Sequence, residues 1–328
     1  MMIERQKVFV TRNIVPTAIL KLREHFDVEV WDDSNPPSKE MLIQKLQNID
    51  GVMTEVSDVI DDEVLASCES LKIVANRAIG FDNIDLDSAS KNGIFVSNTP
   101  GILQESCADF TMALMLSLAR QVTRSNRKVL AGEWKFFDQI PYLGTDVFGK
   151  TLGLLGMGEI AAAVVKRAVG FDMEILYYSR SRKPKLEQAY NIHWASFDEL
   201  LSKSDYISVH VPLTSDTKNL IGKKELKQMK KDAFLINTSR GGTVDHEALR
   251  KALVEGNIAG AALDVTTPEP ITPDDPLVSM ENVIITPHIA SASAATIQRM
   301  GILAADNIIA GLRGKKMPSC LNPEIKSV

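Results

Sequence analysis

Short apolar runs of strand length alternate with helical segments along almost the whole chain. The alternation runs once over residues 7–100, from KVFVTR to IFVSNTP, and again over residues 151–288, from TLGLLGMG to NVIITPH. Parallel strands need a crossover connection of a dozen or more residues, which is usually a helix. The sequence therefore predicts an α/β fold with two doubly wound parallel-sheet domains and a cleft between them.

The domain boundaries are predicted from two helical segments between and after the two series. Pro100 and Gly101 interrupt the chain before an Ala-, Leu- and Met-rich stretch over residues 103–131, and a last helical pattern covers residues 292–312. We expect these segments to be crossovers, so that residues 1–100 and 290–328 form one domain and residues 101–289 form the other. The first stretch is expected to be one long buried helix, because apolar residues recur at helical spacing. They are Leu114, Leu118, Val122 and Val129.

The charge balance and the cysteine count exclude several classes of protein. The chain of 328 residues has 37 Lys and Arg against 42 Asp and Glu, a net charge of -5, which argues against nucleic acid or an anionic membrane as the main partner. Cys68, Cys107 and Cys320 lack metal-ligand spacing, so no disulfide framework and no metal site are expected. The N-terminus has no apolar signal-peptide core, and no apolar run reaches membrane-spanning length. A cytoplasmic location is therefore expected.

A glycine-rich turn follows the first apolar run of the second series. The stretch TLGLLGMGEIAAAVVKRA places Gly156, Gly158 and Ala161 in a G-x-G-x-x-A pattern between a strand and an Ala-rich helix. Small residues at these positions permit a tight turn, close approach to a pyrophosphate and close packing of helix on strand. This context predicts a Rossmann dinucleotide-binding domain, although Glu159 places a carboxylate near the expected pyrophosphate.

The next strand ends in a cluster of cations. In ILYYSRSRKP, residues 175–184, Ser179 and Arg180 stand where an NAD-binding unit usually has an acid that binds the ribose 2′-hydroxyl. A guanidinium and a hydroxyl suit a 2′-phosphate instead. The pattern predicts that NADPH is preferred and that NADH is a possible substitute. The alternative is a solvated basic loop.

Three polar residues follow later strands of the same series. Arg240 ends FLINTSR, Glu269 lies after GAALDV, and His288 ends VIITPH. Each could be an ordinary surface residue, but the carboxyl ends of parallel strands face the ligand crevice of an open α/β sheet. A cation, an acid and a histidine beside a nicotinamide suit hydride transfer to a 2-keto acid. His288 would donate a proton, Glu269 would orient the imidazolium, and Arg240 would bind the substrate carboxylate and polarise its carbonyl.

Several ordered motifs resemble the D-isomer-specific 2-hydroxyacid dehydrogenase family. They are GFDNIDLDSASKNGIFVSNTPG, GKTLGLLGMGEIA, INTSRGGTVD, AALDVTTPEP and ITPHIASAS, and the similarity covers nearly the whole chain. The pieces GEWK, ILYYSRSRK and DNIIAGLRGKKMPSCLNP are most similar to the branch of glyoxylate and hydroxypyruvate reductases, including those that reduce 2-ketogluconate. The chain departs from the family pattern at Glu159, where Arg is common, and at Ala161, where Gly is common.

The resemblance implies roles for most candidate residues. It implies a flavodoxin-like substrate domain beside the Rossmann cofactor domain, a homodimer, catalysis by Arg240, Glu269 and His288, and Asp264 as a partner of the nicotinamide amide. The expected substrate-binding residues are Arg77, Ile79, Gly80 and Arg240. The expected cofactor-binding residues are Gly156, Met157, Gly158, Glu159, Ile160, Ser179, Arg180, Ser181, Thr238, Ser239, Arg240, Asp264 and His288.

Three functions stay open on the sequence. The first is NADPH-dependent reduction of glyoxylate, hydroxypyruvate or 2-ketogluconate to a D-2-hydroxy acid. The second is NAD-dependent oxidation of D-3-phosphoglycerate, because Arg77 resembles an Arg of some phosphoglycerate dehydrogenases. The third is a dinucleotide-sensing binding protein without turnover. Selectivity for the substrate side chain is expected from Val56, Ser57, Arg77 and residues 137–143.

Overall fold

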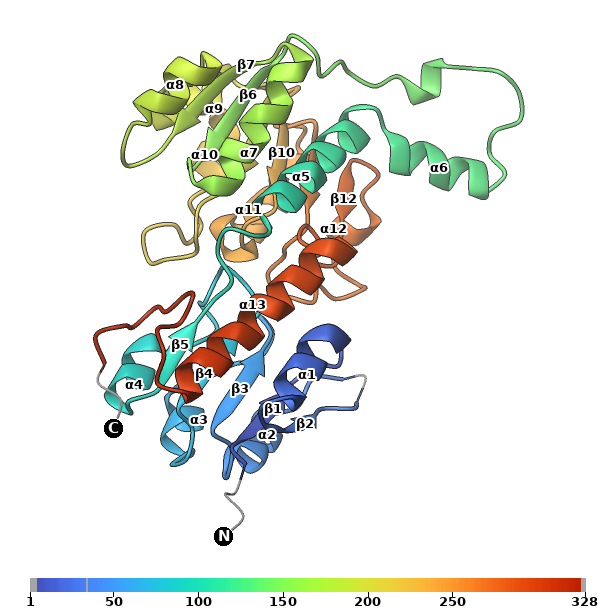
Figure 1. Ribbon diagram of the computed structural model, residues 1–328. Coiled ribbons are helices and arrows are strands. Elements are labelled where there is room, and N and C mark those ends of the chain that lie inside the picture. Colours follow the sequence, from blue (N-terminus) through green and yellow to red (C-terminus); the bar gives the residue numbers. More distant parts are fainter. Residues whose placement is uncertain (1–4, 34, 326–328) are drawn as a thin grey trace. The chain divides into compact units, whose positions relative to one another are not determined.

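The chain forms two compact units in a computed structural model that describes residues 5–33 and 35–325. One unit comprises Met1–Leu103 and Ser293–Val328, and the other comprises Gln104–Ala292. Each unit has one parallel sheet with helices on both faces, which confirms the predicted α/β fold with two parallel sheets (Figure 1).

The first unit is built on a five-stranded parallel sheet in the order β2-β1-β3-β4-β5. This is the flavodoxin-like order for a doubly wound sheet. Its strands are β1 (Lys7–Val10), β2 (Asp27–Val30), β3 (Gly51–Thr54), β4 (Ile73–Asn76) and β5 (Phe95–Ser97). Its helices are α1 (Pro16–Arg23), α2 (Lys39–Leu46), α3 (Asp62–Ala66), α4 (Leu86–Lys91) and α13 (Ala294–Leu312).

Alternate residues of these strands pack against different helices. Val52 and Val74 belong to a buried cluster with α2, α3 and α4, whereas their neighbours Met53, Ile73 and Ala75 belong to a cluster with α1 and α13. Successive side chains of a strand point to opposite faces of a sheet, so both faces of this sheet are buried. The C-terminal helix α13 therefore completes the core of the first unit (Figure 1).

The second unit is built on a seven-stranded parallel sheet in the order β12-β11-β10-β9-β6-β7-β8. Numbered by appearance within the unit and read from the other edge, this is the Rossmann order 3-2-1-4-5-6 with a seventh strand. Its strands are β6 (Thr151–Leu155), β7 (Glu174–Tyr178), β8 (His193–Trp194), β9 (Tyr206–Val209), β10 (Phe234–Asn237), β11 (Gly260–Leu263) and β12 (Val283–Ile285). Its α-helices are α5 (Gln104–Ala119), α6 (Val122–Leu130), α7 (Glu159–Ala168), α8 (Pro184–Tyr190), α9 (Phe197–Lys203), α10 (Lys223–Gln228), α11 (His246–Val254) and α12 (Pro276–Ser279). Its 3₁₀-helices are η1 (Ile140–Tyr142), η2 (Val169–Phe171) and η3 (Gly241–Thr243).

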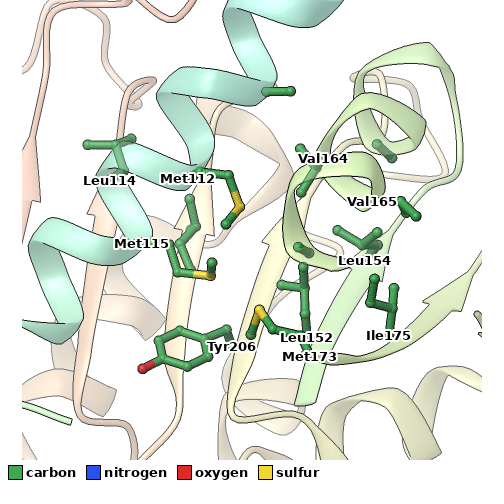
Figure 2. Close-up of a cluster of buried hydrophobic side chains, with 14 of the residues drawn as sticks. Met112, Leu114, Met115, Leu152, Leu154, Val164, Val165, Met173, Ile175 and Tyr206 are labelled. Atoms are coloured by element: carbon green, nitrogen blue, oxygen red, sulfur yellow. The ribbon is translucent and has the colours of Figure 1, made fainter. Parts of the chain in front are cut away.

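One core of the second unit lies between the sheet and helices α5 and α7. Figure 2 shows Met112 and Met115 of α5, Val164 of α7, and Leu152 and Tyr206 of the sheet within this cluster. The neighbouring strand residues face a second cluster with α9, α10, α11 and α12. The sheet is therefore buried on both faces, which holds the ends of its strands in fixed positions.

The prediction of one long buried helix over residues 103–131 is wrong, because the structure has two helices there. α5 ends at Ala119 and α6 begins at Val122, and Gln121 between them has a φ of 52°. The chain returns across the end of α5, where the Thr145 N–H donates to the Ala119 carbonyl at 2.9 Å and the Gln121 side chain donates to the Leu143 carbonyl. The first bond occupies the Ala119 carbonyl, which would accept within the helix if α5 continued. α6 has no buried residue, and Val122 and Val129 are exposed.

Residues 122–143, here called the arm, expose many large apolar side chains. Figure 1 shows α6 and the loop after it extending away from the sheet of their own unit. The exposed residues are Val122, Val129, Leu130, Trp134, Phe136, Phe137, Ile140 and Leu143. Such a concentration of exposed apolar surface is typical of an interaction site.

None of the helices in the described ranges has both the length and the apolar character that crossing a membrane requires.

Candidate functional site

The second unit places the predicted cofactor and catalytic residues after the carboxyl ends of its strands. Gly156 follows β6, Ser179 follows β7, Thr238 follows β10, Asp264 follows β11, and His288 lies three residues after β12. Because all the strands are parallel, these ends meet at one edge of the sheet. The strand order reverses between β6 and β9, and open α/β sheets bind their ligands at such a switch point.

The glycine turn leaves space directly before the N-terminus of α7. Gly156 has a φ of 94°, and a Cβ atom there would lie 2.7 Å from the His210 carbonyl oxygen. Gly158 precedes α7 with a φ of -90°, and a Cβ atom there would meet no atom within 4 Å. The protein therefore requires glycine at residue 156 for its own folding, whereas residue 158 adjoins open space at a helix N-terminus. That space suits the pyrophosphate of a dinucleotide.

The other residues of this turn divide between core and surface. Ala161 has no exposed surface, and Met157 is also buried in the core formed with α5 and α7. Ile160 is half-buried, and Glu159 is exposed in the first helical turn. A carboxylate in the first turn of a helix interacts favourably with the helix dipole, so Glu159 also has a structural role.

The basic loop after β7 separates its two arginines. Arg182 donates two hydrogen bonds to Glu187, through Nε at 3.2 Å and Nη2 at 2.6 Å. These bonds, together with one from the Tyr177 hydroxyl, lower the pKa of Glu187 to about 2. Arg180 is exposed and has no hydrogen-bond or ion-pair partner within the described parts of the chain. Ser179 donates from Oγ to the Ser181 carbonyl at 2.6 Å. Arg180 is therefore the guanidinium available to an anionic ligand.

His288 and Glu269 are in direct contact. His288 Nδ1 lies 2.5 Å from Glu269 Oε1, and the two side chains are 27% and 39% exposed. Burial raises the pKa of Glu269, but the bond and charge of His288, the Thr266 N–H and the charge of Arg240 outweigh it, so the pKa lies below its ordinary value. Glu269 is therefore a carboxylate that orients the imidazole, and Nε2 of His288 is the ring nitrogen left to act on a ligand.

Two neighbouring side chains hold the backbone of Arg240 in place. Its carbonyl oxygen accepts from Asn237 Nδ2 at 2.9 Å and from Thr243 Oγ1 at 2.7 Å. The next residue, Gly241, approaches the loop that carries Glu269 so closely that a Cβ atom would lie 1.9 Å from the Thr266 carbonyl oxygen. The structure thus brings the Arg240 and Glu269 loops together.

Two further cofactor candidates, Thr238 and Ser239, are engaged within the protein. Thr238 is buried, and its hydroxyl lies 3.0 Å from that of Thr111 on α5. Ser239 donates to Asn237 Oδ1 from its backbone N–H and from its hydroxyl. Both residues therefore hold the end of β10 in place.

Asp264 holds the loop that carries His288. Its buried carboxylate accepts from Thr286 Oγ1 at 2.6 Å, from the Ile289 N–H at 2.9 Å and from the Ala290 N–H at 2.8 Å. The Asp264 carbonyl accepts from the His288 N–H at 2.9 Å. The three bonds to the carboxylate use most of its acceptor capacity, and all four bonds hold the loop of His288, so loop positioning is the role that the geometry shows.

The first unit presents two backbone N–H groups at the edge where its strands end. After β4, the carbonyls of residues 78–80 accept from the Thr99 N–H, Asn98 Nδ2 and Asn76 Nδ2 at 2.7–2.9 Å. No acceptor for the N–H groups of Ile79 and Gly80 occurs among residues 5–33 and 35–325. With its carbonyls fixed, this loop offers two preorganised donors that suit a small anion such as a carboxylate.

Arg77, the residue before this loop, is paired inside the protein. Its Nε lies 2.6 Å from Glu55 Oε1, and its Nη2 bonds to Glu55 Oε2, with 8% of the Arg77 side chain exposed. Glu55 was not among the candidates predicted from the sequence. The two residues lie 22 positions apart, on the ends of adjacent strands, so no local pattern connects them.

The strand orders, the glycine turn and the His288–Glu269 pair together describe a dinucleotide-dependent oxidoreductase. Residues 112–290 match the family model "D-isomer specific 2-hydroxyacid dehydrogenase, NAD binding domain". The glyoxylate reductase of Korarchaeum cryptofilum is 47% identical over 325 residues, which cover 99% of this chain and 98% of that protein. The chain belongs to the D-isomer-specific 2-hydroxyacid dehydrogenase family and is an enzyme that uses a nicotinamide dinucleotide.

Two solved structures show the same architecture. A protein from Thermus thermophilus matches with a TM-score of 0.91 and 41% identity, covering 96% of this chain and all of that one. The NADPH-dependent glyoxylate/hydroxypyruvate reductase of Sinorhizobium meliloti, in complex with NADP and malonate, matches with a TM-score of 0.85 and 29% identity, covering 97% of both chains. Both similarities extend over both units, so the relationship is not confined to the dinucleotide-binding fold.

Proposed function

We propose that this enzyme reduces small 2-keto acids, glyoxylate and hydroxypyruvate foremost, to D-2-hydroxy acids with NADPH. The observation that carries the proposal is the 2.5 Å contact of His288 with Glu269, beside Arg240 at the ligand-binding edge of a Rossmann sheet. An acid at a carbonyl is needed for reduction but not for sensing a dinucleotide, which makes a pure binding protein the weaker alternative.

The chain's own residues would carry out every part of the reaction except the hydride donation. When bound, the reduced nicotinamide supplies a hydride to the keto carbon. The Ile79 and Gly80 N–H groups bind the substrate carboxylate, and the Arg240 guanidinium polarises the carbonyl by a charge-assisted hydrogen bond. His288 donates the proton on Nε2 to the developing alkoxide, while Glu269 on Nδ1 holds the ring and stabilises its charge.

The preference for NADPH is supported by the loop after β7. Arg180 is exposed, and no described acid pairs with it, whereas Glu187 is occupied by Arg182. An unpaired guanidinium can bind the 2′-phosphate that distinguishes NADPH from NADH. The name of the Sinorhizobium meliloti relative also specifies NADPH.

Substitution of Arg180 tests this preference. We expect Arg180→Ala to weaken NADPH binding roughly 10- to 100-fold, the size of one lost charge-assisted bond, with little effect on NADH. Fluorescence titration with both cofactors measures it. Arg182→Ala is the matched control, because Arg182 is already paired with Glu187, and its effect on NADPH should be several-fold smaller. Equal losses of NADPH and NADH affinity in Arg180→Ala would contradict the proposal.

The choice of substrate rests on the relatives and on Arg77. The curated relatives include glyoxylate reductases, for example that of Aeropyrum pernix at 46% identity over 99% of this chain. D-3-phosphoglycerate, the second candidate, would need a cation for its phosphate, but Arg77 is neutralised by Glu55. Initial rates should therefore be higher for glyoxylate and hydroxypyruvate with NADPH than for 3-phosphoglycerate with NAD. The reverse order would replace the proposed reaction by phosphoglycerate oxidation.

We also propose that the enzyme is a homodimer joined through the arm. The arm exposes eight large apolar side chains within 22 residues, and interfaces of homodimers are rich in such residues. A second copy of the chain offers the same apolar surface, as a two-fold symmetric contact requires.

A further inference from the structure

The carboxyl end of the first unit's sheet holds a buried cluster of four charges. Arg12 follows β1, Glu55 follows β3, Asp58 lies in the loop after β3, and Arg77 follows β4. Arg12 Nη2 lies 3.2 Å from Asp58 Oδ1, and Arg77 forms a two-bond pair with Glu55. The side chains of all four are at most 15% exposed. The cluster therefore contains two guanidinium groups and two carboxylates, each charge matched by a partner.

The Arg77–Glu55 pair adjoins the loop with the two unpaired N–H groups. Arg77 is two residues before Ile79, and the two segments are also joined through side chains. Asn83 Nδ2 donates to the Glu55 carbonyl at 3.1 Å, and its Oδ1 accepts from Asn76 Nδ2 at 3.1 Å. Asn76 Nδ2 also donates to the Gly80 carbonyl at 2.9 Å. The segments that carry Arg77 and Glu55 are thus held next to the loop of Ile79 and Gly80.

A guanidinium in this place would attract a second negative group on a ligand if it were not neutralised. Arg77 offers a planar fork that matches phosphate or carboxylate, but Glu55 occupies Nε and Nη2 of that fork. Burial raises the pKa of Glu55, whereas the charge of Arg77 and its two hydrogen bonds favour the carboxylate. With Glu55 ionised the pair has no net charge, so the loop presents its N–H groups to one anionic group without an added cation.

We propose that Glu55 is a specificity-determining residue that withholds the Arg77 guanidinium from the ligand, so that the enzyme takes 2-keto acids with one negative charge. A substrate with a second anionic group at C3 finds no free cation for that group. The group must lose its hydration without a new ion pair in exchange, so such substrates bind less well. This inference rests on the proposed function, because it assigns the loop of Ile79 and Gly80 to the substrate carboxylate.

The test compares two substrates that differ only in a phosphate, hydroxypyruvate and 3-phosphohydroxypyruvate. The readout is the ratio of their kcat/KM values with NADPH, phosphorylated over unphosphorylated. Glu55→Gln keeps the shape of the side chain but removes its charge, and we expect this ratio to rise about tenfold or more. Arg77→Gln leaves Glu55 as an unmatched carboxylate, and we expect the ratio to fall below that of the wild type. Circular dichroism shows whether each variant folds. Because the ratio is expected to rise in one variant and fall in the other, either variant alone still tests the proposal.

The double variant Glu55→Gln/Arg77→Gln identifies the cause. It lacks both charges, so the ratio should return to within about threefold of the wild-type value if Arg77 is the group released in Glu55→Gln. A ratio that stays raised in the double variant, or one that does not change in folded Glu55→Gln, would overturn the proposal.

A binding measurement separates this inference from the proposed reaction. Calorimetric titration with malonate, a dianion without a keto group, should show tighter binding to Glu55→Gln than to the wild type, and the double variant should lose the gain. If the wild type reduced no 2-keto acid but malonate binding followed this pattern, the proposed reaction would fail and the role of Glu55 would stand. If keto acids were reduced and malonate binding did not respond to Glu55, the inference alone would fail.

Discussion

His288 has a φ of 54°, a left-handed backbone conformation that few residues other than glycine adopt. Its N–H donates to the carbonyls of Asp264 and Thr286 at 2.9 and 3.0 Å, and the Asp264 carboxylate accepts from the N–H of the next residue, Ile289, at 2.9 Å. Surrounding bonds thus hold the residue in an unfavourable conformation, which is common where a side chain must be aimed at a ligand.

Substitution of His288 can remove its proton without disturbing this backbone. Asn tolerates the left-handed region, so His288→Asn should keep the loop intact while it removes the proton donor. We expect kcat for hydroxypyruvate reduction to fall roughly 10²- to 10⁴-fold, with NADPH affinity within about threefold of the wild type. Steady-state kinetics and cofactor titration measure both, and exposed His193→Asn is the control. An unchanged kcat would exclude His288 as the proton donor.

His210 at the end of β9 is expected to influence stability rather than catalysis. Burial lowers its pKa to about 4, and Nε2 lies 2.8 Å from the Ser208 hydroxyl. Between pH 6.5 and 4 the imidazole is therefore protonated in the unfolded chain but not in the folded protein. The free energy of unfolding falls as the pH falls through this range. His210→Gln should reduce the loss between about pH 7 and about pH 4.5 by about 2 kcal/mol, measured by urea unfolding. His193→Gln should change this loss little, and equal losses in wild type and His210→Gln would contradict the assignment.

The partners of individual charges were the part of the site that the sequence did not reveal. The candidates Arg240, Glu269 and His288 could be chosen because each follows a strand, and strand ends are visible as the ends of apolar runs. The bonds of Arg77 to Glu55 and of Arg182 to Glu187 depend on side-chain directions in three dimensions. From the sequence alone, every cation of the loop after β7 could be a phosphate ligand. In the structure Arg182 is paired with Glu187, and Arg180 has no partner among the described residues.

The two glycines of the β6–α7 turn should respond differently to alanine. Gly156→Ala meets both a φ of 94° and the His210 carbonyl, so it should lower the unfolding midpoint. Gly158→Ala meets no protein atom within 4 Å, so the midpoint should stay within about 2 °C of the wild type. We expect Gly158→Ala to weaken NADPH binding about tenfold or more, because the added methyl occupies the space before α7. Unchanged NADPH affinity would mean that the pyrophosphate does not approach residue 158.

Apolar patterns predicted the existence of the elements better than their limits. Alternating apolar runs and helices predicted both parallel sheets, since strands buried on two faces are almost continuously apolar. The break at Gln121 was not predicted, because Val122 and Val129 continue the helical spacing of α5. Helical periodicity shows that a face is apolar but does not show what covers it. In this chain, nothing within the described residues covers the arm's apolar side chains.

The arm is expected to determine the association state of the enzyme. We expect the wild type to sediment as a dimer, and Leu130→Ser/Phe137→Ser to sediment as a monomer at micromolar concentration, because these side chains are 79% and 81% exposed. Sedimentation velocity measures both. Val254→Ser on α11 is the matched control, since it removes an apolar side chain of similar exposure outside the arm. A wild type that remains monomeric, or a double variant that remains dimeric, would exclude the arm as the interface.

Because α13 belongs to the first unit, that unit consists of two separate parts of the chain. During translation, all residues of the dinucleotide-binding unit leave the ribosome before the residues of α13 do. One face of the five-stranded sheet is left without Ala304, Ala305 and Ile308 for that period. The nascent chain can thus complete its second unit first, and the N-terminal unit acquires its full core only after α13 has been synthesised.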